Sequence, residues 1–143
     1  MAFKFNRYLN IFLLILVGEM IFALPFHITR FFRPTFMEAL NLTNTDLGDA
    51  FAVYGITAMI CYFPGGFIAD RVPEKKLIVG SLISTAAGGF YLSTLPGPLE
   101  LSILYGFWGV TTILFFWAAL IKATKLWGGV DSQGKAFGFL EGG

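Results

Sequence analysis

The sequence that decides the fold is Gly65-Gly66-Phe67-Ile68-Ala69-Asp70-Arg71-Val72-Pro73-Glu74-Lys75-Lys76. It joins two apolar segments, 50–69 and 77–95, neither of which contains a charged residue. Each segment has about the length that a helix needs to cross the hydrocarbon core of a membrane. The short loop between them carries three basic side chains, so we expect it on the cytoplasmic side of that membrane.

This loop resembles the one between helices 2 and 3 of the major facilitator superfamily. The matching positions are Gly66, Ala69, Asp70, Arg71 and Lys75, whereas proline and glutamate at 73 and 74 depart from the family signature. The resemblance implies a conformational role for Gly66, Asp70, Arg71 and Lys75. Asp70 would engage a helix N-terminus in the other half of the transporter, where the helix dipole favours an anion. The alternative is that Asp70 only marks the membrane boundary.

Composition excludes several classes of protein. Only 13% of the 143 residues are charged and 56% are hydrophobic, which is far from the balance of a soluble domain. His27 and Cys61 are the only histidine and cysteine, which argues against a metal site. The sequence lacks a phosphate-binding loop of the Gly-Lys-Ser/Thr type. We therefore predict a membrane protein that is not an enzyme, needs no cofactor and binds no nucleic acid.

The apolar segments predict an all-α integral membrane protein with four transmembrane helices, the first part of a twelve-helix major facilitator fold. We expect helices over 8–33, 46–69, 76–95 and 100–123, and the start of a fifth over 133–143. Pro25 can kink the first helix, because proline lacks a backbone donor. Thr43 or Asn44 should cap the second helix.

Charge sets the expected orientation. Eight of the ten basic residues fall on one side of this topology. They are Lys4, Arg7, Arg71, Lys75, Lys76, Lys122, Lys125 and Lys135; the other two are Arg30 and Arg33. The positive-inside rule then predicts a multi-pass inner-membrane protein with a cytoplasmic N-terminus.

The end of the sequence carries a second resemblance. Gly134-Lys135-x-Phe137-Gly138-x-x-Glu141-x-Gly143 is similar to the start of helix 5 in a bacterial branch related to the organophosphate:phosphate antiporters. We therefore expect an N-terminal fragment, from a truncated gene or a partial reading of one. A complete four-helix protein is the alternative.

Ionisable groups within the first helix are the leading candidates for substrate or ion contact, because burying them in a membrane is costly. Glu19 and Arg30 are eleven residues apart, which places them within roughly 20° of one helix face and about 16 Å apart along the axis. Glu19 could carry a coupling proton or contact a cationic substrate, or it could pair with a basic group on another helix. Arg30 could clamp an anion or be solvated at the outer end. For His27, a packing role is favoured over proton exchange.

The fourth helix offers two weaker candidates. Trp108 and Thr112 lie on one stripe with Lys122, and packing is favoured over a role in lining a cavity. Many superfamily members have an arginine where this sequence has Tyr105. That departure weakens any proton-coupling role transferred from the family.

The resemblance implies secondary active transport of a small solute by alternating access within the lipid bilayer. The two arginines hint at an organic anion, and a coupling ion is possible in such transporters. We expect the fragment to be inactive alone. Two alternatives remain open: a complete four-helix dimeric exporter, and a membrane scaffold that transports nothing.

Overall fold

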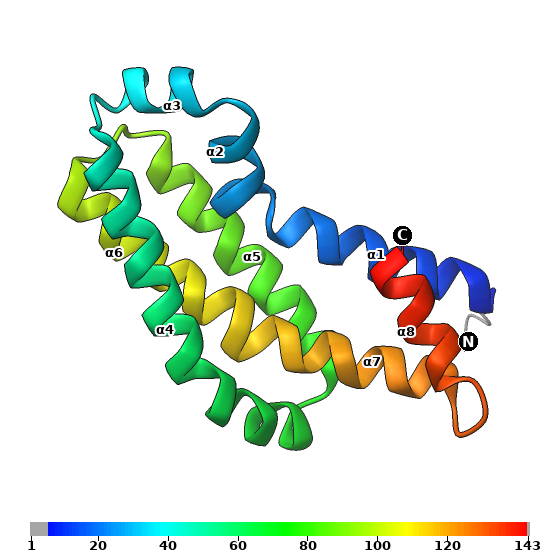
Figure 1. Ribbon diagram of the computed structural model, residues 1–143. Coiled ribbons are helices and arrows are strands. Elements are labelled where there is room, and N and C mark those ends of the chain that lie inside the picture. Colours follow the sequence, from blue (N-terminus) through cyan, green and yellow to red (C-terminus); the bar gives the residue numbers. More distant parts are fainter. Residues whose placement is uncertain (1–5, 143) are drawn as a thin grey trace.

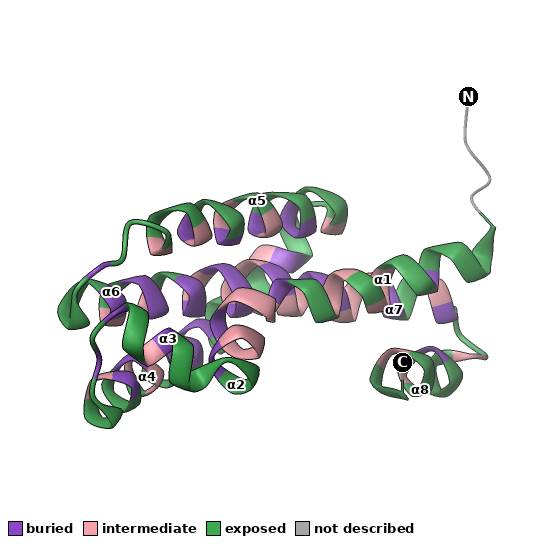
Figure 2. Ribbon diagram, turned by 90° about the horizontal axis from the view of Figure 1, so that it is seen from above, coloured by how far each residue is buried: buried purple, intermediate pink, exposed green. Residues whose placement is uncertain are grey.

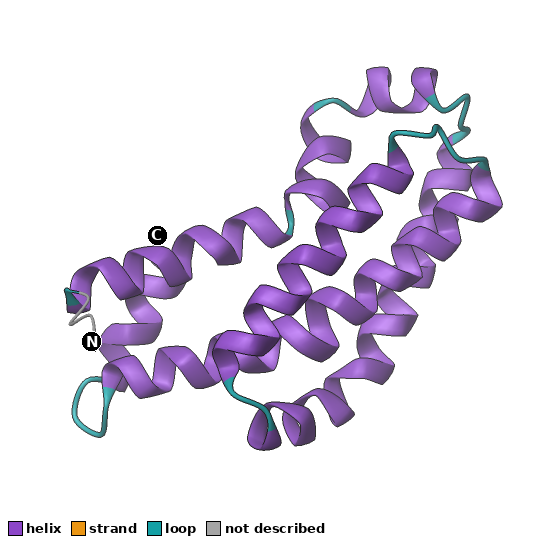
Figure 3. Cartoon of the chain, turned by 180° about the vertical axis from the view of Figure 1, so that it is seen from behind, coloured by secondary structure: helices purple, strands orange, loops and turns teal. Residues whose placement is uncertain are grey.

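The computed structural model describes residues 6–142, and within that range it contains helices, turns and loops but no strand (Figure 3). Lys4, one of the expected cytoplasmic charges, and Gly143 lie outside the described residues. The elements are α1 (Arg7–Ile21), the π-helix η1 (Ala23–His27), α2 (Ile28–Phe31), α3 (Arg33–Ala39), α4 (Asn44–Arg71), α5 (Glu74–Leu92), α6 (Pro98–Gly109), the π-helix η2 (Val110–Trp117), α7 (Ala118–Gly128) and α8 (Gln133–Gly142).

The predicted cap of the second long helix is confirmed at Thr43. Its hydroxyl accepts from the Asp46 amide at 3.2 Å, and the Asp46 carboxylate accepts from the Thr43 amide at 2.7 Å. This reciprocal pair forms a capping box, which satisfies amide groups that the first helical turn leaves free. Helix α4 consequently begins at Asn44, slightly before the expected start, and continues to Arg71.

Helices α6, η2 and α7 form one rod from Pro98 to Gly128, and this rod is the centre of the bundle (Figure 1). It packs against α4, where small residues allow a close approach. A Cβ added to Gly109 would lie only 3.1 Å from the Tyr54 carbonyl oxygen of α4. The rod is also more deeply buried than α4: 56% of its most apolar window is buried, against 17% for that of α4 (Figure 2).

Buried hydroxyl and indole groups join the helices inside the bundle. The Thr85 and Thr111 hydroxyls lie 2.8 Å apart, which links α5 to the rod. The Tyr54 and Thr112 hydroxyls, 2.7 Å apart, link it to α4. Within residues 6–142, each buried side-chain nitrogen or oxygen has a hydrogen-bond partner. Such pairing is needed wherever water is excluded.

The first expected helix, over 8–33, is broken rather than straight. Helix α1 and the segment Ala23–Phe31 meet at a bend of 43°. After Phe31 the chain turns into the short helix α3, which lies across one end of the bundle (Figure 1). At the opposite end, α8 turns back beside α7 and α1.

Length and composition identify two helices that can cross a membrane, Asn44–Arg71 and Pro98–Gly128. The bent pair that starts at Arg7 makes a third if it counts as one span. Helix α5 is shorter, with 19 residues, and its first turn carries Glu74 and two lysines. The apolar part of α5 is therefore shorter than the helix itself. Length and composition alone do not establish four membrane crossings.

Candidate functional site

A cleft of about 560 Å³ lies at the bend of the first helix, and it contains the three candidates that the sequence offered on that helix. Glu19, His27 and Arg30 all line it, together with Arg33. The remaining lining residues are Phe22, Phe26, Thr29 and Phe51. One carboxylate and several basic groups therefore face a shared space beside an aromatic wall.

The break distributes these candidates over three elements. Glu19 belongs to α1, His27 ends η1 and Arg30 belongs to α2. The Thr29 hydroxyl stabilises the turn between them, because its single proton is shared between the Phe26 carbonyl at 3.0 Å and the Pro25 carbonyl at 3.2 Å. The cleft thus follows from a local irregularity that a straight helix lacks.

A second hydrogen bond to this turn comes from a distant helix. The Tyr105 hydroxyl of α6 donates to the Pro25 carbonyl oxygen at 2.8 Å, and both residues are fully buried. From the sequence, Tyr105 was notable only as a departure from the family's arginine. Its long-range contact with the bend left no signal in the residue pattern.

Aromatic rings form the apolar side of the cleft. The Phe26 ring stacks on that of Phe51 with centroids 5.8 Å apart, and it meets the Tyr54 ring edge-on at 4.8 Å. These contacts join the turn of the first helix to α4. The rings give the cleft an apolar wall, whereas the charged side chains of Glu19, Arg30 and Arg33 are exposed.

The charged groups of the cleft keep much of their bonding capacity. Among residues 6–142, no ion pair within 4 Å joins Glu19 to a basic side chain. The Arg30 guanidinium lies 5.8 Å from the centre of the Phe31 ring, whereas that of Arg33 donates to the Asn44 side chain at 2.9 Å. The Arg30 guanidinium can therefore donate hydrogen bonds to a bound anion, and the Glu19 carboxylate can bind a proton or a cation.

Trp108 and Thr112 occupy a different place. Both are fully buried between helices and neither lines the cleft. The Trp108 indole donates to the Thr85 carbonyl at 3.1 Å, and the Thr112 hydroxyl donates to the Trp108 carbonyl at 2.7 Å. Both side chains thus bond to groups inside the bundle, and their packing role stays a prediction.

The loop motif lies at the other end of the bundle from α3. Gly66, Asp70, Arg71 and Lys75 are exposed, and the Arg71 guanidinium lies 5.7 Å from the centre of the Phe67 ring. Lys122 of α7 connects to this loop, because its ammonium donates to the Ala69 carbonyl at 2.7 Å and lies 3.8 Å from the Glu74 carboxylate. The loop is thus attached to the central rod.

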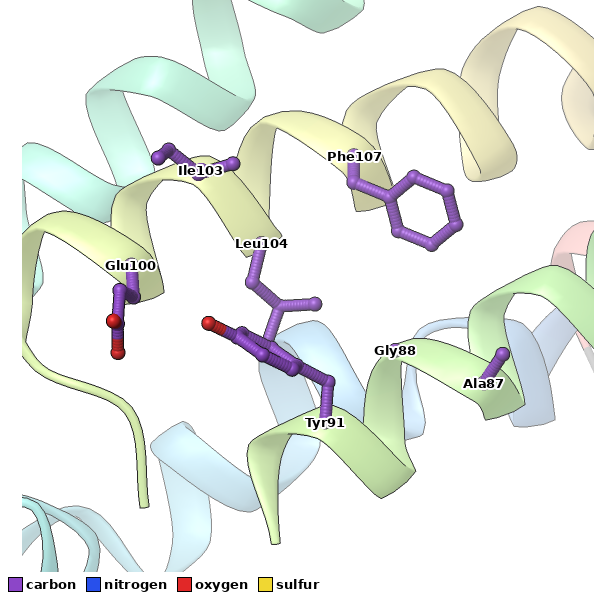
Figure 4. A pocket seen from close by; sticks show the side chains of 7 residues that line it. All are labelled: Ala87, Gly88, Tyr91, Glu100, Ile103, Leu104 and Phe107. Atoms are coloured by element: carbon purple, nitrogen blue, oxygen red, sulfur yellow. The ribbon is translucent and has the colours of Figure 1, made fainter. Parts of the chain in front are cut away.

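Two further clefts contain none of the first-helix candidates. One, of about 690 Å³, lies between α1, α5 and α7 and includes Lys75. The other, of about 390 Å³, lies between α5 and α6; Figure 4 shows Tyr91, Glu100 and Leu104 among its walls. Within the described residues no group of three His, Cys, Asp or Glu side chains could hold a metal ion.

Comparison with known proteins gives the family. The sequence pattern of the Major Facilitator Superfamily matches residues 14–143. The chain belongs to the major facilitator superfamily. As a superfamily member with helices long and apolar enough to cross a membrane, it is a membrane protein of a transporter family.

Curated relatives support this membership. The chain is 34% identical to the inner membrane protein YihN and 29% identical to the inner membrane protein YqcE, both of Escherichia coli K12, over 92% and 97% of its own length. An uncharacterised MG294 homologue of Mycoplasma pneumoniae is 29% identical over 94% of this chain. The chain spans about a third of the length of each of these relatives. No solved structure matches it significantly.

Proposed function

We propose that the chain is the N-terminal part of a secondary transporter that moves a small organic anion across the inner membrane by alternating access. The cleft at the bend of the first helix carries this proposal, because it gathers Arg30, Arg33 and His27 around one space. Guanidinium groups match the oxygen geometry of phosphate, sulfonate and carboxylate. The proposal includes membership of the antiporter-like branch related to organophosphate:phosphate exchangers.

Glu19 complements the basic groups in this proposal. A carboxylate at membrane depth costs roughly 2.5–3.5 kcal/mol on insertion scales, so a position facing lipid is unfavourable. In the cleft it can bind a coupling proton while the arginines hold the substrate. The proposed path therefore runs beside Glu19 and Arg30, with Trp108 and Thr112 supporting the neighbouring helices.

The proposed topology has four crossings: the bent first helix, α4, α5 and the rod from α6 to α7. Two contacts support this topology, because they place basic side chains at the same end of the helix bundle. Arg7 stacks 4.8 Å from the centre of the Trp127 ring, and Lys122 bonds to the end of α4. Arg33 lies at the other end, beside Asn44. The positive-inside rule then assigns the Arg7 end to the cytoplasm.

The loop after α4 acts in this proposal as a conformational latch. Asp70 is exposed at its start and is free to meet a helix N-terminus in the other half of the transporter. The Lys122 contacts hold the loop against the rod, so a movement of either one is passed to the other.

Counterflow into liposomes tests the proposed function. The full-length protein is reconstituted and offered phosphorylated, sulfonated and carboxylated small solutes, with a neutral sugar and an amine as comparisons. We expect exchange of at least one anionic class, and we expect Arg30→Ala to weaken it by more than tenfold. Exchange confined to the amine or the sugar would contradict an anion-binding cleft.

A further inference from the structure

The break in the first helix leaves backbone groups that depend on partners outside the regular helical pattern. Pro25 has no N–H, and in the π-helical turn the Phe22 carbonyl accepts from two amides, those of Phe26 at 3.0 Å and His27 at 3.3 Å. The Pro25 carbonyl lies beside this irregularity, and its residue is fully buried. A carbonyl without a partner is costly in an apolar surrounding, so its donors help to decide the shape of the turn.

Tyr105 supplies such a donor from another helix. Its hydroxyl reaches the Pro25 oxygen at 2.8 Å across 80 positions of sequence. Its ring is held edge-on by those of Phe51 and Trp108, with centroids 5.4 Å and 5.1 Å away. The donor is therefore fixed relative to the bundle. Thr29 bonds the same oxygen at 3.2 Å, but from the next turn of the same segment, so it cannot orient that segment against α6.

The bend determines which side chains share the cleft. Glu19 precedes the break, whereas His27 and Arg30 follow it. A change in the 43° angle would move the Glu19 carboxylate relative to the Arg30 guanidinium without altering either group. Tyr105 itself does not line the cleft.

We propose that Tyr105 is the positioning residue of this cleft: its hydroxyl fixes the bend of the first helix and thereby the placement of Glu19 relative to Arg30. The importance of that placement rests on the proposed function, but the bend can be measured without any substrate. The same bond couples α6 to the first helix, so a displacement of α6 is transmitted to the cleft.

Spin-label distances in liposomes test the proposal. Cysteines at Phe12 of α1 and Ile83 of α5, both exposed, carry the labels in a Cys61→Ala background. The arm from Phe22 to Phe12 is about 15 Å long, so loss of the whole bend would displace its end by about 10 Å. We expect Tyr105→Phe to shift or broaden the distance by several Å. The matched control is Tyr54→Phe, which removes a buried hydroxyl bonded to Thr112 and should leave the distance unchanged.

Two further variants separate a donor from a space-filling ring. p-Aminophenylalanine at position 105 restores an N–H donor and should restore the wild-type distance. Thr29→Val leaves Tyr105 as the remaining side-chain donor, so its distance should stay near that of the wild type. A wild-type distance in Tyr105→Phe overturns the proposal, as does a shift of several Å in Thr29→Val. If the distances respond as expected while no anion is exchanged, the proposed function fails and the positioning role stands.

Discussion

Arg30 and Arg33 share a cleft but differ in what their guanidinium groups already contact. Arg33 donates to Asn44 at 2.9 Å, so part of its capacity is used at the end of α4. Arg30 faces only the ring of Phe31 at 5.8 Å among the contacts within the described chain. We therefore propose Arg30 as the stronger anion ligand, and Arg33 provides a matched comparison in the same cleft.

Replacing Arg30 tests the fork geometry. Arg30→Lys keeps the charge but loses the bidentate arrangement, so substrate affinity should fall, and Arg30→Ala should reduce it further. We expect about a tenfold rise in KM for the lysine variant, which corresponds to about 1.4 kcal/mol. Exchange kinetics of the anion found by counterflow give the measurement. Arg33→Lys should have a smaller effect, and equal effects at both positions would contradict the assignment.

Glu19 is the candidate for coupling, because no basic side chain within 4 Å neutralises it in the described residues. Glu19→Gln should abolish accumulation driven by a proton gradient while leaving substrate exchange intact. Accumulation, counterflow and melting temperature are measured together, with Glu38→Gln on α3 as the control. A structural ion pair with another part of a longer protein predicts lower expression or melting temperature instead.

At the scale of elements, the loop between α4 and α5 joins two helix ends to the central rod. Lys122 bonds the Ala69 carbonyl near the end of α4 and also lies close to Glu74 at the start of α5. The positive charge of Lys122 thus lies near the C-terminal end of α4, where the helix dipole favours a cation. Asp70 lies between these contacts and remains exposed, which suits a group with a partner elsewhere.

Asp70→Asn tests the latch. The substitution keeps the side-chain size and removes the charge that would bias the transporter's conformations, so insertion should be normal and transport should fall several-fold. Membrane content and exchange rate are compared with those of Asp131→Asn, an exposed acidic residue in another loop. Wild-type flux with unchanged labelling of the two conformations would remove Asp70 from the mechanism.

The sequence predicted helices wherever the cause was local. Thr43 and Asp46 indicate the start of α4, and the uncharged segment 50–69 makes this helix apolar enough to cross a membrane. The break of the first helix was only half visible: Pro25 indicated a kink, but its π-helical form and its bond to Tyr105 depend on packing between distant segments. The gathering of Glu19, His27 and Arg30 in one cleft was missed for the same reason, since helix geometry alone separates them along the axis.

At the scale of the whole molecule, the proposed orientation in the membrane rests on where the basic residues gather. Lys122 lies at the loop between α4 and α5, and Arg7 lies beside Trp127 at the end of α7. The turn between α5 and α6 lies at the opposite end of α5 from these contacts. Leu99, which follows this turn at the start of α6, is 75% exposed. If the first end is cytoplasmic, the turn before α6 faces outward.

Cysteine labelling in intact cells tests this orientation. In a Cys61→Ala background, a cysteine at Leu99 should react strongly with a membrane-impermeant maleimide added outside, and a cysteine at Glu74 should react weakly. After the membrane is permeabilised, both should react, because each position is in the first turn of its helix, Glu74 in α5 and Leu99 in α6. That second measurement separates a protected position from an unreactive one. Equal labelling of the two cysteines from outside would contradict an α5 that crosses the membrane, since Glu74 begins that helix and Leu99 lies beyond its other end.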